Sequence, residues 1–400
     1  MSFFHRTFVT VLTLLFTVST LVEAARIRGY TATELYTFED AAETQHSLFY
    51  QTLSLRVASL GSKSLTLNSM LRYQGDSADD FAESGSLKIH TLNLRWSPNA
   101  SWEARLGRQF LAEGVGFGTY DAIRVGYTFT RKSQVIVWGG VSAPLSREAE
   151  LEKAEEYAAV GLRFQQTVAR SVMINLSYLH GEREGDLFRH RAGVSVSSNP
   201  LPNLHGTVLA YLNLEGPATL HRLRILLRYL HSNSLRLFAE AAQATPELPP
   251  DSPFANVPIE AVTLLRLGGS YQIFERYWVG LRTQSLLSGN EPNVTLGFSL
   301  EGPWGEIGYR QRFGDFGDES GIWGYAQYRP AAFLQLYAGV DFSQYSFVEY
   351  DNDDQSALQA GFRLYPIKSL ELGASLQRLQ NRQFNEDWRS LFNLKWTFGD

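Results

Sequence analysis

The chain has 400 residues, of which 44% are hydrophobic and 19% charged, and it is rich in tyrosine (19), phenylalanine (25) and tryptophan (8). It is too polar for a bundle of membrane helices and too apolar for a disordered chain. Cysteine is absent and the net charge is −5. This excludes disulfides, thiolate metal sites and covalent c-type haem on this chain, and argues against a general affinity for nucleic acid.

The first 24 residues predict a secretory signal peptide. One cation, Arg6, precedes an apolar run from Thr7 to Val22, and small residues follow at the offset that signal peptidase requires. A permanent membrane anchor is the alternative, but the run is shorter than the roughly 20 residues that span a bilayer as a helix. We therefore expect residues 1–24 to be removed and residues 25–400, beginning at Ala25, to form the exported domain.

The mature chain alternates apolar and polar side chains with a period of two. Clear runs, in chain order, are Leu65–Tyr73, Leu223–Tyr229, Leu358–Leu364 and Phe392–Phe398. Such runs last about ten residues, which is the length that crosses a bilayer as a tilted strand. The pattern therefore predicts amphipathic strands with one face toward lipid.

The connections between these strands alternate in length. Short turns, such as that near residues 97–100, alternate with longer polar connections, such as those near residues 75–85 and 144–156. Counting the connections predicts 22 strands, with 18 to 22 as the accepted range. We expect an all-β, transmembrane, antiparallel up-and-down β-barrel with short periplasmic turns, longer acidic outer loops and both ends on the short-turn side.

Charge follows the predicted topology. Acidic residues gather in the outer connections, whereas arginines lie within strands on the polar face. Because a charge on the lipid face costs about 2–4 kcal/mol at the bilayer midplane, we expect these arginines to line the lumen. The predicted lumen-lining arginines are Arg56, Arg72, Arg95, Arg105, Arg124, Arg163, Arg189, Arg191, Arg222, Arg224, Arg228, Arg266, Arg282, Arg310, Arg312 and Arg363.

Two interpretations of this arginine-rich face remain open. The arginines either create a net basic lumen that attracts anions, or pair across strands with carboxylates and stiffen the wall. The carboxylates available for pairing are Glu103, Glu240, Glu306 and Glu371. Because arginine outnumbers them, the first interpretation is preferred.

Together, the signal peptide, the amphipathic strands, the alternating connections and the absence of cysteine resemble Gram-negative outer-membrane porin-like barrels. The stretch Leu106–Gln109, followed by a glycine-rich loop, is similar to one found in porin and alginate-export-type barrels. The resemblance covers residues 25–400. It implies a place in the outer membrane, in contact with lipid and lipopolysaccharide.

The last strand resembles the signal that the barrel-assembly machinery reads. Its apolar residues Phe392, Trp396 and Phe398 are expected to face lipid and to serve as the assembly signal. Gly399 and Asp400 follow the terminal aromatic residue and depart from the usual pattern, which puts the speed of assembly in doubt.

Other motifs have structural interpretations. Gly114–Gly118 resembles a phosphate-binding loop, but a strand pattern and not a helix follows it, so an inward-folded barrel loop that narrows the pore is preferred. The run Asp351–Asp354 lacks a full calcium-loop pattern and is interpreted as a solvated outer face. No histidine spacing indicates a zinc site, and no nucleophile–histidine–carboxylate set stands out, so we predict neither a catalytic nor a metal site and no enzyme.

Two main functions follow from the size of the predicted barrel. Twenty-two strands give a backbone diameter of about 44 Å and a bore of roughly 25–30 Å. The leading hypothesis is a porin-like channel for solutes or ions that favours anions. The alternative resembles the barrel of porin–cytochrome complexes, in which the lumen holds a multihaem c-type cytochrome and this chain carries no cofactor. A structural or adhesive barrel is third, because the outer loops are short.

Overall fold

The chain forms 22 β-strands. The computed structural model describes residues 25–40, 44–76, 85–144, 146–148, 150–153, 157–169, 171–183, 186–246, 260–288, 292–314, 317–347, 350–382 and 386–399. The strands are β1 (Arg26–Glu39), β2 (Gln45–Ala58), β3 (Leu65–Asp76), β4 (Ser86–Trp96), β5 (Trp102–Glu113), β6 (Gly116–Thr130), β7 (Ser133–Ser142), β8 (Ala158–Ala169), β9 (Val172–Arg183), β10 (Asp186–Leu201), β11 (Leu204–Asn213), β12 (Thr219–Ser232), β13 (Leu235–Ala244), β14 (Val262–Phe274), β15 (Tyr277–Leu287), β16 (Pro292–Gly302), β17 (Gly305–Phe313), β18 (Asp318–Ala331), β19 (Leu334–Phe347), β20 (Tyr350–Ile367), β21 (Leu370–Gln380) and β22 (Asp387–Phe398).

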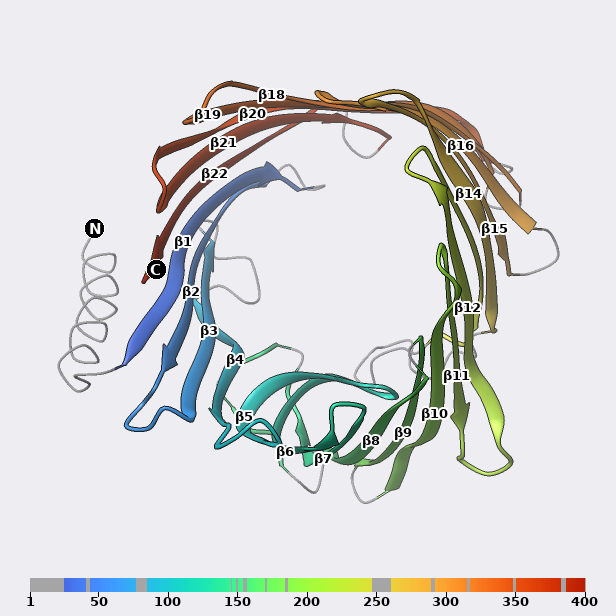
Figure 1. Ribbon diagram of the computed structural model, residues 1–400. Helices are drawn as coiled ribbons and strands as arrows, with labels where there is room; N and C mark the ends of the chain where they lie inside the picture. The colour runs from blue at the N-terminus through green and yellow to red at the C-terminus, as the bar shows by residue number, and fades with distance from the viewer. Residues whose placement is uncertain are drawn as a thin grey trace.

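Each strand pairs antiparallel with the next, and the first pairs with the last. The closing seam between β1 and β22 runs from Gly29 opposite Phe398 to Thr37 opposite Ser390. Figure 1 shows the resulting ring. The predicted all-β, 22-stranded up-and-down barrel is therefore confirmed. Within the described residues, no helix is both long and apolar enough to cross a bilayer.

Alternation along each strand separates two faces of the barrel wall. On β12, Ile225 and Leu227 are exposed apolar residues, while Arg224 and Arg228 flank them at alternate positions that face the other side of the strand. Exposed apolar side chains recur at every second position on other strands, as at Leu296, Phe298 and Leu300 of β16. This face is the outer, lipid-facing side, because exposed apolar side chains in such an unbroken band are stable only against lipid.

The strands extend further than the sequence predicted at two connections. Gly114 and Val115 alone join β5 to β6, where the sequence predicted a longer connection over residues 110–118. Asp351–Asp354 lies within β20, and Asp353 is directly opposite Tyr345 of β19, so this acidic run continues a hairpin and is not a loop. Residues 1–24, the predicted signal peptide, lie outside the described residues, as do 77–84 and 154–156 of the acidic connections.

One hairpin, β5–β6, leaves the wall and bends into the ring. Strand β5 pairs with β4 only from Ala104 to Arg108, and its remaining residues pair with β6 alone. Figure 1 shows β5 and β6 curving inside the line of the neighbouring strands. The hydrophobic core of the molecule lies between this hairpin and the wall beneath it. Its members are Leu111, Val115, Tyr120, Ala122, Trp138, Ala159 and Leu179, with Tyr211 packed against them.

Candidate functional site

The tip of the inward hairpin is bound to the inner wall. The backbone N–H of Val115 donates a hydrogen bond to Ser177 Oγ on β9 (3.1 Å), and the Tyr211 hydroxyl on β11 donates one to the Gly114 carbonyl (3.0 Å). Gly193 on β10 leaves room between them, because a Cβ there would lie 2.6 Å from a Val115 methyl carbon. The hairpin therefore lies along the wall from β7 to β11 and does not cross the lumen.

An aromatic pair supports the base of this hairpin. The rings of Tyr120 on β6 and Trp138 on β7 are 4.7 Å apart, and both side chains are buried. Gly161 on β8 and Gly116 in the hairpin make room for the indole, since a Cβ at either position would come within 2.6 Å of it. The inner face here is thus a packed apolar surface, unlike an open polar pore lining.

On the other side of the hairpin, an arginine fixes the neighbouring loop. Arg108 is only 4% exposed and donates to Asp121 on β6, with Nη2 2.7 Å from Oδ2. Its guanidinium also donates to the backbone carbonyls of Arg147, Glu148 and Glu150 in the β7–β8 connection. That connection in turn contacts β4, through the Ile89 N–H and the Arg147 carbonyl (2.7 Å). The loop thus replaces β5 beside β4 where β5 bends away.

Beneath the hairpin, the inner arginines are neutralised by carboxylates. Glu103 lies within 3 Å of guanidinium nitrogens of Arg95, Arg105 and Arg124. Glu113, which is 6% exposed at the end of β5, binds Arg124 Nε at 2.8 Å and Arg163 Nη1 at 2.9 Å. These contacts link β4, β5, β6 and β8 in one charged network.

On β12–β15, the balance of charge is different. Glu240 on β13 binds Arg224 at 2.8 Å and lies 3.6 Å from Arg266. Arg222 and Arg228 on β12 and Arg282 on β15 are exposed. Among the residues that the structure describes, these three make no ion pair, and neither does the exposed Arg56 on β2.

The remaining predicted arginines lie in smaller groups. Arg189 and Arg191 lie on β10; Arg189 donates a hydrogen bond to the Tyr120 hydroxyl, and Arg191 is near enough to interact with it electrostatically. The other ion pairs are Arg72 with Glu34, Arg310 with Glu319 and Asp341, Arg312 with Glu319, and Arg363 with Glu371. Of the carboxylates that the sequence suggested as partners, Glu306 makes no ion pair among the described residues.

The sequence missed the residues that hold the hairpin. Alternation along the strand places Arg108 on the outer face with the exposed residues Leu106 and Phe110, so the sequence pattern predicts no role for it in the lumen. The sequence predicts a long connection over Phe110–Gly118, whereas the structure places Glu113 at the end of strand β5. The repeated small residues opposite the hairpin, including Gly161 and Gly193, were the available signal, because glycine on a strand marks close approach of another segment.

The residues of the predicted assembly signal lie at the closing seam. Phe392 and Trp396 are 45% and 46% exposed on β22. Phe398 is directly opposite Gly29 of β1, and a Cβ at that glycine would come within 3.1 Å of the phenyl ring.

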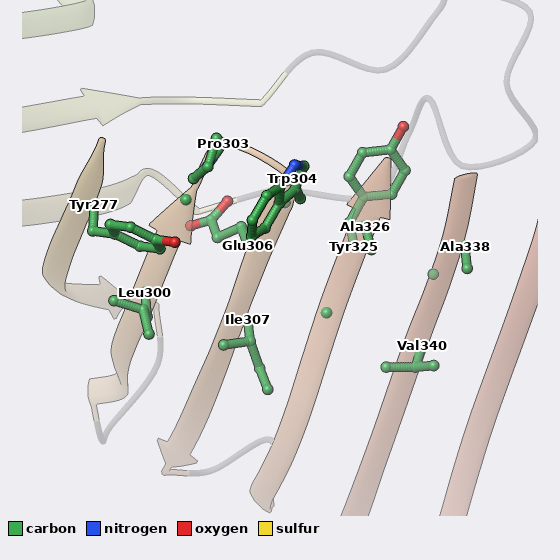
Figure 2. A pocket seen from close by; sticks show the side chains of 14 residues that line it. Tyr277, Leu300, Pro303, Trp304, Glu306, Ile307, Tyr325, Ala326, Ala338 and Val340 are labelled. Carbon is green, nitrogen blue, oxygen red and sulfur yellow. The ribbon is translucent and has the colours of Figure 1, made fainter. Parts of the chain in front are cut away.

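A shallow apolar pocket of about 420 Å³ lies near the short-turn end of β16–β19. Figure 2 shows Leu300, Ile307 and Val340 along it, with Tyr277 and Trp304 at its end. Leu300 and Ile307 belong to the outer face, so this pocket is not part of the inner wall. Aromatic side chains at such a position match the girdle that membrane barrels present to the lipid interface.

No described group of three or more histidine, aspartate or glutamate side chains is arranged to hold a metal ion. The candidate site is therefore the inner wall itself, with a hairpin-covered region over β7–β10 and a bare region over β12–β15.

Comparison with known proteins supports the fold. No family model matches the chain, and no curated protein matches it. Among solved structures, OpdQ of Pseudomonas aeruginosa is 9% identical, with a TM-score of 0.50 over 94% of this chain and 99% of that one. The translocation pore of the P pilus usher PapC is 8% identical, with a TM-score of 0.54 over 93% of this chain and 99% of that one. The chain is similar to these barrels over nearly its whole length, and it has a porin-like barrel fold.

Proposed function

We propose that this protein is an outer-membrane channel that gives solutes or ions a path through the barrel and favours anions. The porin-like fold and the similarity to a translocation pore support a conduit and not an enzyme. The predicted signal peptide and the terminal aromatic strand support export, contact with lipid and lipopolysaccharide, and insertion by the barrel-assembly machinery.

The observation that carries the anion preference is the set of exposed inner arginines that have no carboxylate partner among the described residues. Arg222, Arg228 and Arg282 are exposed on strands β12 and β15, and Glu240 is already bound by Arg224. Uncompensated charge of one sign along a pore lowers the energy of the opposite ion there and raises its local concentration. Solutes that pass along β12–β15 therefore meet a positive wall.

The hairpin sets where this path runs. It covers the inner face of β7–β10 and carries Glu113 into contact with Arg124 and Arg163, so this side of the lumen offers few free charges. A salt gradient across a planar bilayer tests the proposal. The reversal potential is expected to show that the wild-type barrel passes chloride more readily than potassium.

A second candidate function is the sheath of a multihaem c-type cytochrome. Twenty-two strands enclose a bore of roughly 25–30 Å. Because the hairpin lies against the wall, most of this bore is left for another occupant, which favours the sheath. Isolation from the native host in mild detergent, followed by haem staining, separates the two functions. A colourless, stable barrel with steady single-channel conductance would reject the sheath, and a stoichiometric haem protein would reject the open channel.

A further inference from the structure

Three arginines meet at the short-turn end of the first hairpin. Arg28 on β1 is directly opposite Arg56 on β2, and Arg26 is two residues along from Arg28 on the same side of the strand. Leu35, an exposed apolar residue of β1, lies an odd number of residues from Arg26 and Arg28, so it faces the opposite, outer side of the strand. The three arginines, called here the mouth trio, therefore lie on the inner face of the barrel.

The mouth trio has no carboxylate partner in the described chain. Arg26, Arg28 and Arg56 are all exposed, and none makes an ion pair. With Ala58, they line a pocket of about 190 Å³. Like charges directly opposite each other on paired strands destabilise the pair, so this arrangement is unfavourable while the pocket holds only water.

A second group of three arginines lies on the same inner wall, and there the chain itself supplies the negative charge. Arg95, Arg105 and Arg124 also lie directly opposite one another across three strands. There, Glu103 binds all three. The mouth trio has the same charge and the same inner face, but no described residue supplies it with the carboxylate that Glu103 supplies there.

We propose that the mouth trio binds a soluble phosphate-type oxyanion, which supplies the missing negative charge. Guanidinium groups match phosphate geometry through paired N–H donors, and several of them around one pocket favour a multiply charged oxyanion over chloride. The inner-face position selects a soluble phosphate over a lipid headgroup. The site is separate from the bare wall of β12–β15, and binding there does not require the barrel to conduct.

Calorimetric titration of inorganic phosphate into the purified full-length barrel in detergent, at constant ionic strength, tests this site. The double substitution Arg28→Gln/Arg56→Gln is expected to weaken phosphate binding at least tenfold. The matched control is Arg131→Gln, which removes one exposed cation from the turn between β6 and β7 at the same end of the barrel. Its dissociation constant is expected to stay within twofold of wild type.

Thermal unfolding guards against a folding defect. Without phosphate, Arg56→Gln is expected to melt no lower than wild type, because it removes a like-charge contact. Phosphate is expected to raise the melting temperature of wild type and not that of the double variant. Equal phosphate affinity in wild type and double variant, or equal losses in the variant and the Arg131→Gln control, would overturn the proposal.

Asp400, which lies outside the described residues, supplies a further test. Phosphate binding that appears only after Asp400→Asn, and is absent in wild type, would mean that the chain neutralises the trio itself, and it would also overturn the proposal. A barrel that binds phosphate at the trio but shows no anion preference in bilayers would reject the proposed channel selectivity and leave this site standing.

Discussion

The inner wall has two regions that use the same residue type in opposite ways. From β7 to β10, the inward hairpin covers the wall, Glu103 and Glu113 neutralise the arginines at its base, and aromatic side chains fill the space between. From β12 to β15, nothing described covers the wall, and Arg222, Arg228 and Arg282 are exposed and make no ion pair with any described residue. The comparison teaches that an arginine row predicts a position on the inner face, whereas its electrostatic effect depends on whether another segment brings carboxylates to it.

The largest expected effect comes from weakening the β1–β22 seam that closes the barrel, because both regions of the inner wall depend on a closed barrel. Replacing Phe398 with Asp removes a ring that packs on Gly29 at the seam and puts a charge beside lipid. Folded protein in the outer membrane, scored by heat-modifiable gel mobility, is expected to fall severalfold. The control is Thr397→Asp, one residue away on the other face of β22, which should keep most of the folded yield. An unchanged yield in Phe398→Asp would contradict the proposed assembly signal.

The next prediction compares the stability lost on replacing a buried arginine with that lost on replacing an exposed one. Arg108→Met leaves the Asp121 carboxylate, which is only 10% exposed, without its partner, so we expect a loss of about 3–5 kcal/mol of stability. Arg224→Met in the bare region removes an arginine that is 40% exposed, and its partner Glu240 keeps Arg266 at 3.6 Å, so we expect a loss of about 0–1 kcal/mol. Denaturant unfolding in detergent measures both.

A second substitution at the Arg108 site tests the cause of that loss. The double variant Arg108→Met/Asp121→Leu is expected to recover part of the lost stability, because no buried charge remains unpaired. Equal losses in Arg108→Met and Arg224→Met would show that the β7–β8 connection is not held by the buried pair.

A smaller effect concerns the carboxylate at the hairpin tip. Glu113→Gln weakens hydrogen bonds to Arg124 and Arg163, and we expect a loss of about 1.5–3 kcal/mol. It also frees positive charge beneath the hairpin, so the anion preference in bilayers should increase. If Glu113→Gln lowered the anion preference, the hairpin region would not be the neutral side of the wall.

The smallest effect tests the space beneath the hairpin. Gly193→Ala places a methyl group 2.6 Å from Val115, so we expect overpacking to cost about 1–3 kcal/mol. Gly297→Ala is the matched control on the inner face of β16, where the nearest atoms lie 3.9 Å away, and its stability should change little. Thermal unfolding of the two variants compares the regions directly, and equal melting temperatures would mean that the hairpin is not packed on β10.

The sequence predicted the strands of the barrel wall better than it predicted the hairpin inside the barrel. The period of two predicted the strands and a count of the connections between them predicted their number; both are local properties of the chain, and the structure confirms the 22 strands. The hairpin could not be predicted, because its position depends on contacts between residues far apart in the chain, such as Val115 with Ser177. Arg108 could not be predicted for the same reason. It lies on the outer side of β5, where a charge is not expected, but a loop that is distant in the chain buries it.

The central claim is that the bare wall of β12–β15 makes the path favour anions. The most direct test is the reversal potential in planar bilayers of the triple variant Arg222→Glu/Arg224→Glu/Arg228→Glu, compared with wild type and with Arg131→Glu at the short-turn end. We predict that wild type and the Arg131→Glu control favour anions and that the triple variant shifts toward cations. A cation-selective wild-type barrel, or a triple variant with unchanged selectivity, would contradict the account.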